Sequence, residues 1–586
     1  KAGLGLLGNM VGDNKAVACI EDTAVALSDL PAFIAEFTAI MEAHKQKAVY
    51  YAHAGAGELH LRPILNLKTK KGVGLFREIT TEVAALTKKY KGSFSGEHGD
   101  GIVRAEFLKM QIGASNFELL KRIKKRFDPN NIFNPGKITD AWPMDESLRT
   151  DTKTPEISTK FDFSDSQGIV RLAEKCNGSG DCRKTELSAG AMCPSYHATR
   201  DEKDTTRARA NMLREVLTQN QAPNAFNSEA LKEAFSLCIS CKACASECPS
   251  NVDMATAKSE FQYQYAKSNG RSKSDLFVAN STKYNRMAYR FPKLANVFLQ
   301  QRWLVSILKK RANIAAKRSM PEISTKRLDK VIYKPIKEAV VKRKVYLFVD
   351  EFSHYLDIEI VFDSIQLLTH LGYEVEVLTE YDSARALLSK GFLEEATKEI
   401  NRTVAAFQDI ITAQTPLVGI EPSAILGFRD EFPRLATHKE KAKKLGAHCF
   451  LIEEFISAEI RKGVIVSDQF TSEEKHIKVH VHCHQKALSD QKITFDMLNL
   501  PKNYKPTLIP SGCCGMAGSF GYEKEHYETS MKIGELRLFP AVRKASIDTI
   551  IAANGTSCRH QIKDGTQRKA LHPVTILKEA LLPLKD

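Results

Sequence analysis

The hydrophobic and polar positions divide the chain into regions with different predicted structure. Short apolar runs such as residues 47–51 predict strands, and residues 75–89 have the spacing of a helix. The turn signals Asp-Pro-Asn-Asn and Asn-Pro-Gly at residues 128–136 close this region. The pattern therefore predicts a first domain over residues 1–145 that mixes strands and helices.

The pattern then changes three times before the middle of the chain. Residues 146–165 are rich in Asp, Thr, Ser and Pro, which is typical of a linker. Residues 166–275 are helix-rich and include the helical stretch Thr205 to Leu217. Residues 276–340 combine aromatic side chains with many Lys and Arg, and we expect a basic helical connector there.

From residue 341 to residue 586 the pattern alternates between strands and helices in two successive halves. The first half is predicted to contain strands at 345–349 and 374–378 and a helix near 357–371, and the second to contain strands near 446–452 and 478–482. The predicted fold class is therefore multidomain α+β with a tandem α/β region at its end. No apolar run reaches about 18 residues, so the sequence predicts no helix that crosses a membrane.

Length and charge narrow the class of protein. A chain of 586 residues suggests three to five domains, and 43% hydrophobic with 26% charged residues excludes collagen-like, fully disordered and multi-span membrane chains. The net charge of +15 favours an anionic surface or an acidic substrate as partner. No nucleic-acid-binding module is recognisable, so nucleic acid is not an expected partner. The opening at Lys1 reads as the middle of a domain, so we expect the C-terminal part of a longer protein.

Gly3, Gly5 and Gly8 spell G-x-G-x-x-G, the fingerprint of dinucleotide binding. That function needs a preceding strand and an acidic residue about 20 positions later, whereas Glu21 and Asp22 come too early. We therefore interpret these glycines as a flexible segment near a site.

Eleven of the thirteen cysteines fall into three groups. Clustered thiols in a chain without a visible signal peptide indicate metal ligands in a reducing compartment such as the cytoplasm. The clearest group is a complete C-x₂-C-x₂-C-x₃-C-P run made of Cys238, Cys241, Cys244 and Cys248. Its spacing suits three thiolates on one iron–sulfur cluster and a fourth that reaches a second cluster. Zinc is the alternative, but zinc sites usually have two C-x₂-C pairs separated by a longer loop.

An upstream group has the same form with one thiol missing. Cys176, Ser179 and Cys182 fit C-x₂-C-G-x-C with serine at the middle position, and Cys193-Pro194 supplies the ending. Cross-ligation would join Cys193 to Cys238, Cys241 and Cys244 around one [4Fe–4S] cluster. Cys176, Cys182 and Cys248 would hold the other, either as [3Fe–4S] or as [4Fe–4S] with an oxygen ligand from Ser179 or Asp181, unless this second site is empty. Forty-four residues separate Cys193 from Cys238. Two cysteine groups with a helical stretch of this length between them resemble the helical dicluster ferredoxin domain of respiratory dehydrogenase subunits.

Two glycine-rich motifs of the first domain carry metal-ligating residue types. One places His53 and His60 seven residues apart, and the other contains Glu97 and His98. Two imidazoles and a carboxylate suit a divalent metal with an open position, either zinc or manganese, that acts as a Lewis acid. From spacing alone, turn residues with satisfied histidines remain an equal alternative.

These motifs, together with Asp128-Pro-Asn-Asn-Ile-Phe-Asn-Pro-Gly-Lys at residues 128–137, resemble the C-terminal domain of FAD-linked oxidases of the vanillyl-alcohol-oxidase superfamily. The branch is that of the D-lactate, glycolate and D-2-hydroxyglutarate dehydrogenases. The resemblance implies roles for five residues: metal ligands His53, His60 and Glu97, the catalytic base His98, and Asn134 near the flavin. The family motif H-A-G-D-G-N reads H-A-G-A-G-E here, which leaves the substrate contacts open. In that family an FAD-binding domain precedes this one, and the chain has none of it.

The last cysteine group resembles the CCG cysteine-rich domain of glycolate oxidase, anaerobic glycerol-3-phosphate dehydrogenase and heterodisulfide reductase subunits. It comprises Cys483, Cys513, Cys514 and Cys558. The resemblance implies a further cluster or a zinc ion, or else a vestigial site, and Gln561 stands where a last thiol is often found. The domain is normally duplicated, and the first copy, near residues 345–440, carries Ala424 at a usual Cys position. We therefore expect that copy to be structural.

The order of the three domains resembles the large fused FAD/iron–sulfur D-2-hydroxyacid dehydrogenases of bacteria. The resemblance implies oxidation of a D-2-hydroxy acid, with D-lactate first and D-2-hydroxyglutarate second, and electron transfer to a quinone or another carrier. Two other hypotheses remain: an electron-transfer protein that serves a separate flavoprotein, and a zinc scaffold.

The connector offers a surface for peripheral contact with the inner face of the cytoplasmic membrane. Apolar residues from Phe291 to Ile307 recur with roughly helical spacing beside the basic triplets 309–311 and 342–344. The alternative is a helix that packs against its own domains.

Overall fold

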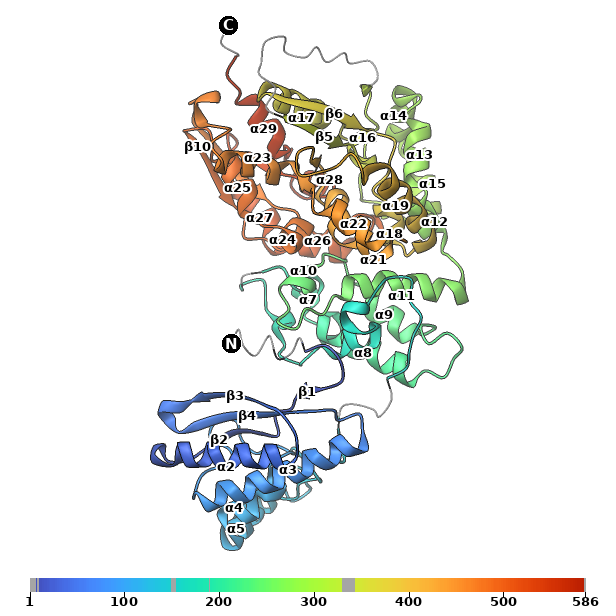
Figure 1. Ribbon diagram of the computed structural model, residues 1–586. Coiled ribbons are helices and arrows are strands. Elements are labelled where there is room, and N and C mark those ends of the chain that lie inside the picture. Colours follow the sequence, from blue (N-terminus) through green and yellow to red (C-terminus); the bar gives the residue numbers. More distant parts are fainter. Residues whose placement is uncertain (1–6, 8–9, 149–153, 189, 329–342, 584–586) are drawn as a thin grey trace. The chain divides into compact units, whose positions relative to one another are not determined.

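The computed structural model describes residue 7 and residues 10–148, 154–188, 190–328 and 343–583. The chain forms two compact units, Lys1–Glu156 and Ile157–Asp586, and each is described by itself (Figure 1). The glycine motif at Gly3, Gly5 and Gly8 and the basic residue Lys342 lie outside the described residues.

The first unit is built on a small antiparallel sheet around β4 (Glu58–Leu65). β3 (Ala48–His53) pairs with residues 58–63 of β4 and β2 (Ile20–Ala24) with residues 58–61, whereas β1 (Lys15–Ala16) pairs with its last two residues. The predicted strand at 47–51 is therefore confirmed as β3. The sheet places the β3–β4 hairpin, which carries the predicted histidines, at one end of the unit.

Helices cover this sheet and complete its core. α2 (Leu30–Ala43) packs against α3 (Lys70–Lys89), and aromatic side chains such as Phe33, Phe37 and Phe76 fill the space between helices and sheet. The predicted helix at 75–89 begins five residues earlier because the Thr69 hydroxyl caps α3 by accepting a hydrogen bond from the Gly72 N–H at 3.0 Å. The unit is completed by α4 (Leu108–Ile112) and α5 (Ala114–Phe127).

The predicted linker over residues 146–165 is too long at its C-terminal end. Phe161 and Phe163 are buried in the core of the second unit. The N–H groups of Lys160 and Phe161 donate to the Glu260 carboxylate at 2.9–3.0 Å. Two aromatic side chains and a buried carboxylate therefore fix the end of the predicted linker. The Asp, Ser and Thr content of the segment does not indicate that this end is ordered.

The second unit begins with the helices that carry the first two cysteine groups. They are α6 (Ile169–Glu174), α7 (Pro194–Thr199), α8 (Thr206–Gln219), α9 (Glu229–Ser236), α10 (Ala243–Ser246) and α11 (Met254–Asn269). The predicted helix at 205–217 is confirmed as α8, which the Thr205 hydroxyl caps.

Two parallel sheets follow, and both have the same order of their first three strands. The first has the order β6-β5-β7-β8 and the second the order β10-β9-β11. The strands are β5 (Arg343–Phe348), β6 (Tyr373–Leu378), β7 (Leu417–Gly419), β8 (Cys449–Leu451), β9 (Lys475–His480), β10 (Tyr504–Leu508) and β11 (Ile550–Ala553). The shared order supports a tandem of related halves.

Helices flank both sheets and cover them. In the first half they are α16 (Glu351–Tyr355), α17 (Ile358–His370), α18 (Arg385–Ser389), α19 (Leu393–Phe407), α20 (Pro422–Ile425), α21 (Glu431–Leu435) and α22 (Lys439–Gly446). From β8 onward they are α23 (Ile452–Arg461), α24 (Cys483–Leu488), α25 (Lys492–Leu498), α26 (Tyr527–Leu536), α27 (Leu538–Lys544), α28 (Thr556–Thr566) and α29 (Pro573–Glu579). One hydrophobic core runs from the cysteine-bearing helices into both halves.

The connector lies in the chain between the cysteine-bearing helices and the first parallel sheet. It forms four short helices, α12 (Lys273–Ala279), α13 (Ser281–Ala288), α14 (Pro292–Gln300) and α15 (Arg302–Ala312). Just beyond α15 the fully buried Arg318 donates to the Gly521 carbonyl at 2.9 Å, to Gln561 at 2.8 Å and to Asp564 at 3.1 Å. Arg318 therefore fixes the end of the connector to the second half. No helix within the described ranges is both long and apolar enough to cross a membrane.

Replacing Arg318 with Ala is expected to lower the free energy of unfolding by about 3–5 kcal/mol, because it leaves the buried Gln561 oxygen and the partly buried Asp564 carboxylate without their partner. Chemical denaturation followed by circular dichroism measures this change. The control is Lys317→Ala at the adjacent exposed position, where a loss below about 1 kcal/mol is expected. Equal losses in the two variants would contradict the role of Arg318.

Candidate functional site

The histidine motifs of the first unit lie on the β3–β4 hairpin and on the loop that follows α3. His53 pairs with Glu58 across the two strands, and Tyr51 pairs with His60. The hairpin turns at Gly57, whose φ is +76° and where a Cβ atom would lie 2.1 Å from the Val25 carbonyl oxygen. Only glycine fits this turn, which brings both histidines to the same end of the sheet.

The structure brings together all four predicted metal and base residues. The rings of His53 and His60 are 5.1 Å apart, and those of His60 and His98 are 5.6 Å apart. A Glu97 carboxylate oxygen lies 3.8 Å from His53 Nε2 and 3.3 Å from His98 Nε2. The carboxylate therefore stands between the two exposed imidazoles.

Glu58 is a further member that the sequence analysis missed. Its carboxylate belongs to a group with His53, His60 and Glu97 in which the ligand atoms all lie within 4.8 Å of one another. Glu58 is the final residue of the H-A-G-A-G-E motif at residues 53–58. The family motif has Asn at that position, so from the sequence alone Glu58 is only a departure from the family.

A buried carboxylate shapes the loop that presents Glu97 and His98. Asp22 accepts hydrogen bonds from the Glu97 N–H at 2.7 Å and from the His98 N–H at 2.9 Å. Burial alone would raise the pKa of Asp22, but hydrogen bonds from the Glu58 carboxyl and these two N–H groups hold it well below its usual range. The shared hydrogen bond with Asp22, together with burial, raises the pKa of Glu58. Asp22 therefore stays charged and fixes the loop.

The donor set fits a divalent metal. His60 Nδ1 and Glu58 Oε1 are buried, and neither has a hydrogen-bond partner among the residues that the structure describes. Burial lowers the pKa of His60, which favours the neutral imidazole that binds metals. Two imidazoles and two carboxylates form a mixed set suited to zinc or manganese.

Asn134, predicted near the flavin, lies apart from these contacts. It has φ +49° and lies in an exposed loop that Asp128 organises by accepting hydrogen bonds from the Ile132 and Phe133 N–H groups at 2.8 and 2.9 Å. Within the described residues, no hydrogen bond or ion pair joins Asn134 to the histidine cluster. The exposed Ile132 and Phe133 make this loop an apolar surface.

In the second unit the four thiols predicted for the first cluster are buried in one neighbourhood. Burial raises the pKa of Cys193 to about 11, and the nearby thiols of Cys182 and Cys238 add to it. Burial likewise raises the pKa of Cys244, with Cys193 and Cys238 among its neighbours. Cys241 neighbours both Cys244 and Cys193. The cross-ligation predicted from spacing thus places Cys193 with the Cys238–Cys244 run.

Two charged side chains, the exposed Glu247 and the buried Arg209, hold the Cys193 loop. The Glu247 carboxylate accepts hydrogen bonds from the Ala191 N–H at 2.8 Å and the Met192 N–H at 3.0 Å. The Arg209 guanidinium lies 3.9 Å from the Cys193 sulfur. A positive charge beside the thiol favours the thiolate, the form that binds iron.

The second predicted site contains its three thiols. Burial raises the pKa of Cys182, and Cys176 and Cys248 lie close enough to add to it. Asp181 neighbours Cys248, whereas the Ser179 hydroxyl donates to the Asp181 carboxylate at 3.1 Å. The two oxygen ligands considered therefore lie together, and Asp181 is close enough to Cys248 to raise its pKa.

The third cysteine group also comes together, and it includes a histidine that the sequence analysis missed. A hydrogen bond with Cys513 is the main cause that lowers the pKa of Cys483 to about 7. Cys514 shares hydrogen bonds with Cys513 and Cys558. His480 at the end of β9 lies within 4.8 Å of the Cys514 and Cys558 sulfurs. Gln561 pairs with Arg318 instead of replacing a ligand.

The first half supports this site without contributing a thiol to it. Its lone Cys449 is buried and donates to the Leu445 carbonyl at 3.2 Å. Glu421, in the degenerate motif, accepts from the Thr556 N–H at 2.8 Å and lies 3.8 Å from His482 Nε2. The first half therefore helps to position the residue next to Cys483.

The three thiol groups form a continuous series. Cys182 neighbours Cys193, and Cys483 neighbours Cys241. The His484 ring nitrogen Nε2 lies 3.1 Å from the Ser240 carbonyl, next to Cys241. The thiols of the dicluster region and Cys483 of the last cysteine group are therefore close enough to raise one another's pKa.

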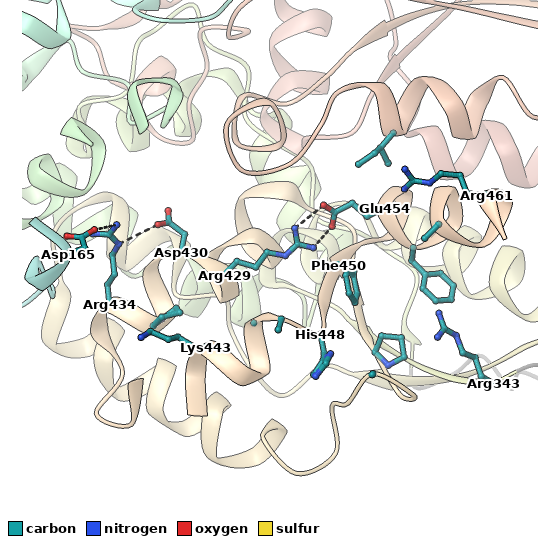
Figure 2. Close-up of a pocket in the computed structure, with 18 of the residues that line it drawn as sticks. Asp165, Arg343, Arg429, Asp430, Arg434, Lys443, His448, Phe450, Glu454 and Arg461 are labelled. Carbon is teal, nitrogen blue, oxygen red and sulfur yellow. Dashed lines mark hydrogen bonds and ion pairs between the residues drawn. The ribbon is translucent and has the colours of Figure 1, made fainter. Parts of the chain in front are cut away.

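The second unit also has a cleft of about 890 Å³, which lies at the edge of its first parallel sheet and has no cysteine among the described residues that line it. Figure 2 shows that two of its four arginines are already engaged: Arg429 pairs with Glu454 at 2.9 Å, and Arg434 pairs with Asp165 at 3.1 Å. Such paired guanidinium groups offer little to an anionic ligand.

Comparisons with known proteins identify two domains. Residues 1–138 match the family "FAD linked oxidases, C-terminal domain", and residues 175–253 match the "4Fe-4S dicluster domain". D-2-hydroxyglutarate dehydrogenases of Pantoea ananatis and Escherichia coli are each 28% identical over 99% of this chain and 60% of their own length. One subunit of the anaerobic glycerol-3-phosphate dehydrogenase of Escherichia coli is 25% identical over 42% of this chain and 61% of its own length. The chain therefore spans about 60% of the length of the D-2-hydroxyglutarate dehydrogenases that it matches.

Replacing Cys193 with Ala is expected to remove about four of seven or eight irons per chain, because the thiol belongs to the four-cysteine site. Iron analysis and electron paramagnetic resonance after dithionite reduction, on anaerobically purified protein, measure the loss. Cys449→Ala, at the buried lone cysteine, is the control and should leave the iron content unchanged. Unchanged iron in Cys193→Ala, or zinc in place of iron in the unaltered chain, would contradict the assignment.

Proposed function

We propose that this chain takes part in the FAD-linked oxidation of a D-2-hydroxy acid to the 2-oxo acid and conducts the electrons away through iron–sulfur clusters. The observation that carries this proposal is the cluster of His53, Glu58, His60 and Glu97 with His98 beside it. This cluster occurs in the domain of FAD-linked-oxidase type and shares a chain with three neighbouring thiol groups.

The residues of the first unit divide the chemistry among them. A divalent metal held by His53, Glu58, His60 and Glu97 supplies Lewis acidity toward the substrate hydroxyl and carboxylate. FAD, when bound, supplies the acceptor for the hydride from the α-carbon. His98 takes the hydroxyl proton as general base, and its half-exposed ring is open to a substrate. Asn134 is the residue of this chain that we assign to the flavin, on an apolar loop that the cofactor could cover.

The names of the relatives favour D-2-hydroxyglutarate over D-lactate as substrate. Four relatives that align over 98–99% of this chain carry that name. A 2-hydroxy acid with a second carboxylate needs an additional cationic contact. Arg62, the cation nearest His60 along β4, is already paired with Glu21 at 2.5 Å. That contact must therefore come from elsewhere.

The electrons leave through the thiol series. We assign a [4Fe–4S] cluster to Cys193, Cys238, Cys241 and Cys244, and a second cluster to Cys176, Cys182 and Cys248. Asp181 is the proposed fourth ligand of a [4Fe–4S] form of the second cluster. Cys483, Cys513, Cys514 and Cys558 hold a further cluster or a zinc ion at the end of the route.

A second candidate function is electron transfer on behalf of a separate flavoprotein, without catalysis by this chain. The likeness to one subunit of the anaerobic glycerol-3-phosphate dehydrogenase favours it, because that likeness covers 42% of this chain. In that case the first unit would bind a partner and hold no catalytic metal. The two functions therefore differ in what His60 and His98 do.

Replacing His60 with Ala is expected to abolish zinc or manganese binding, whereas His98→Ala should retain the metal and slow flavin reduction by D-2-hydroxyglutarate at least about 100-fold. Metal analysis and stopped-flow flavin absorbance on flavin-loaded protein separate the two effects. His476→Ala, at an exposed histidine of the second unit, is the control. Near-normal reduction in His98→Ala would contradict its role as base. Metal-free unaltered protein with reducible clusters would favour the second candidate function.

A further inference from the structure

A mostly apolar cavity of about 280 Å³ lies inside the second unit, where four segments of the chain meet. Ile239 comes from the dicluster region and Phe277 from the connector. Phe352 comes from the first half and Tyr522 from the second. The cavity is therefore a product of the whole unit and belongs to no single domain.

One wall of this cavity is formed by residues of the thiol series. Cys483 lines it directly, and so do Ser240 and Lys242, which flank Cys241 in the chain. The other three cysteines of the last group are not among its lining residues. An occupant would thus lie beside the place where the dicluster region meets the last cysteine group.

The charges at the wall are already paired with one another. Lys242 forms ion pairs with Asp430 and Glu431, and Arg385 pairs with Glu431 at 2.7 Å. A charged ligand gains no free partner from this network and loses its hydration. A volume slightly below the usual range of about 300–1,000 Å³ admits one ring system. The wall therefore favours a small, flat and neutral ligand.

We propose that this cavity binds the ring of a quinone-class acceptor, which the clusters reduce. This reduction rests on the proposed function, because the electrons come from oxidation of the hydroxy acid. That oxidation releases two electrons and two protons. The quinone takes the two electrons one at a time through the thiol series and two protons from solvent, and becomes the quinol.

The test uses 2-methyl-1,4-naphthoquinone as the probe and dithionite, removed before mixing, as the source of electrons. Ala386 and Ala312 are small buried residues of the wall, so Ala386→Leu and Ala312→Leu each fill the cavity. Both variants should bind the quinone at least about tenfold more weakly by calorimetry and oxidise more slowly, with unchanged iron content. Ala316→Leu, at an exposed position outside the cavity, should behave as the unaltered chain.

Equal quinone binding in the cavity variants and the control would overturn the proposal, and so would an absence of binding to the unaltered chain. Because dithionite supplies the electrons, neither result bears on hydroxy-acid oxidation. Failure of this site and failure of the proposed function are therefore distinguishable.

The outer surface of the connector carries a second, independent inference. Residues 276–321 contain ten Lys and Arg and no Asp or Glu. The same stretch exposes large apolar side chains, with Phe291 71%, Leu294 70% and Trp303 65% exposed. The exposed apolar residues of α12–α15 and their joins are Leu276, Tyr284, Met287, Phe291, Leu294, Val297, Phe298, Trp303 and Ile307.

We infer that this surface docks on an anionic lipid bilayer. Exposed Phe and Trp suit the boundary between headgroups and acyl chains, and neighbouring Lys and Arg attract anionic headgroups. An acidic protein would satisfy the charges but would give the scattered apolar side chains no acyl region to enter. The exposed side chains of the connector thus face lipid and do not pack against the chain's own domains.

Sedimentation with vesicles tests this inference. The unaltered chain should bind vesicles of equal parts phosphatidylglycerol and phosphatidylcholine, and bind pure phosphatidylcholine weakly. Lys310→Glu with Arg311→Glu, and separately Phe291→Ser with Trp303→Ser, should each lower binding at least about tenfold. Lys441→Glu with Lys444→Glu, at exposed positions of α22, is the matched charge control. Vesicle binding that is absent in the unaltered chain, or unchanged in both connector variants, would overturn the inference.

Discussion

The second unit depends on the convergence of three separate chain segments on its buried thiols. Cys193 must reach the Cys238–Cys244 run, and Cys248 must reach back to Cys176 and Cys182. Thiols that are buried together raise one another's pKa, so the arrangement makes physical sense around a positive centre that binds thiolates. The rest of the unit follows from this requirement, because its core continues from the cysteine-bearing helices into both parallel sheets.

In each unit a carboxylate fixes a loop that carries functional side chains: Asp22 is fully buried, whereas Glu247 is exposed. Asp22 collects the backbone N–H groups of the loop that carries Glu97 and His98, and Glu247 does the same for the loop that carries Cys193. A charged acceptor of several N–H bonds fixes a loop that has no regular structure of its own. The functional side chains are thereby held by backbone contacts and remain free to bind a ligand.

The spacing of residues along the chain predicted which cysteines lie near one another and where several strands and helices occur. The pairing of the Cys groups follows from C-x₂-C-x₂-C-x₃-C-P, and the β-α alternation predicted β5, β6 and α17 to within about two residues. The additions to the sites, Glu58 and His480, could not be found this way, because each reaches its site through strand pairing. The end of the linker was missed for a similar reason, since the Phe161 N–H donates to Glu260, which lies 99 residues further along the chain.

The 44-residue excursion between Cys193 and Cys238 has a consequence for how the chain folds. A cluster bound by both residues would act as a cross-link that closes this loop and removes much of its conformational entropy in the unfolded chain. Iron delivery and folding would then be one thermodynamic event. A cell short of iron would accumulate a chain whose second unit lacks its strongest long-range restraint.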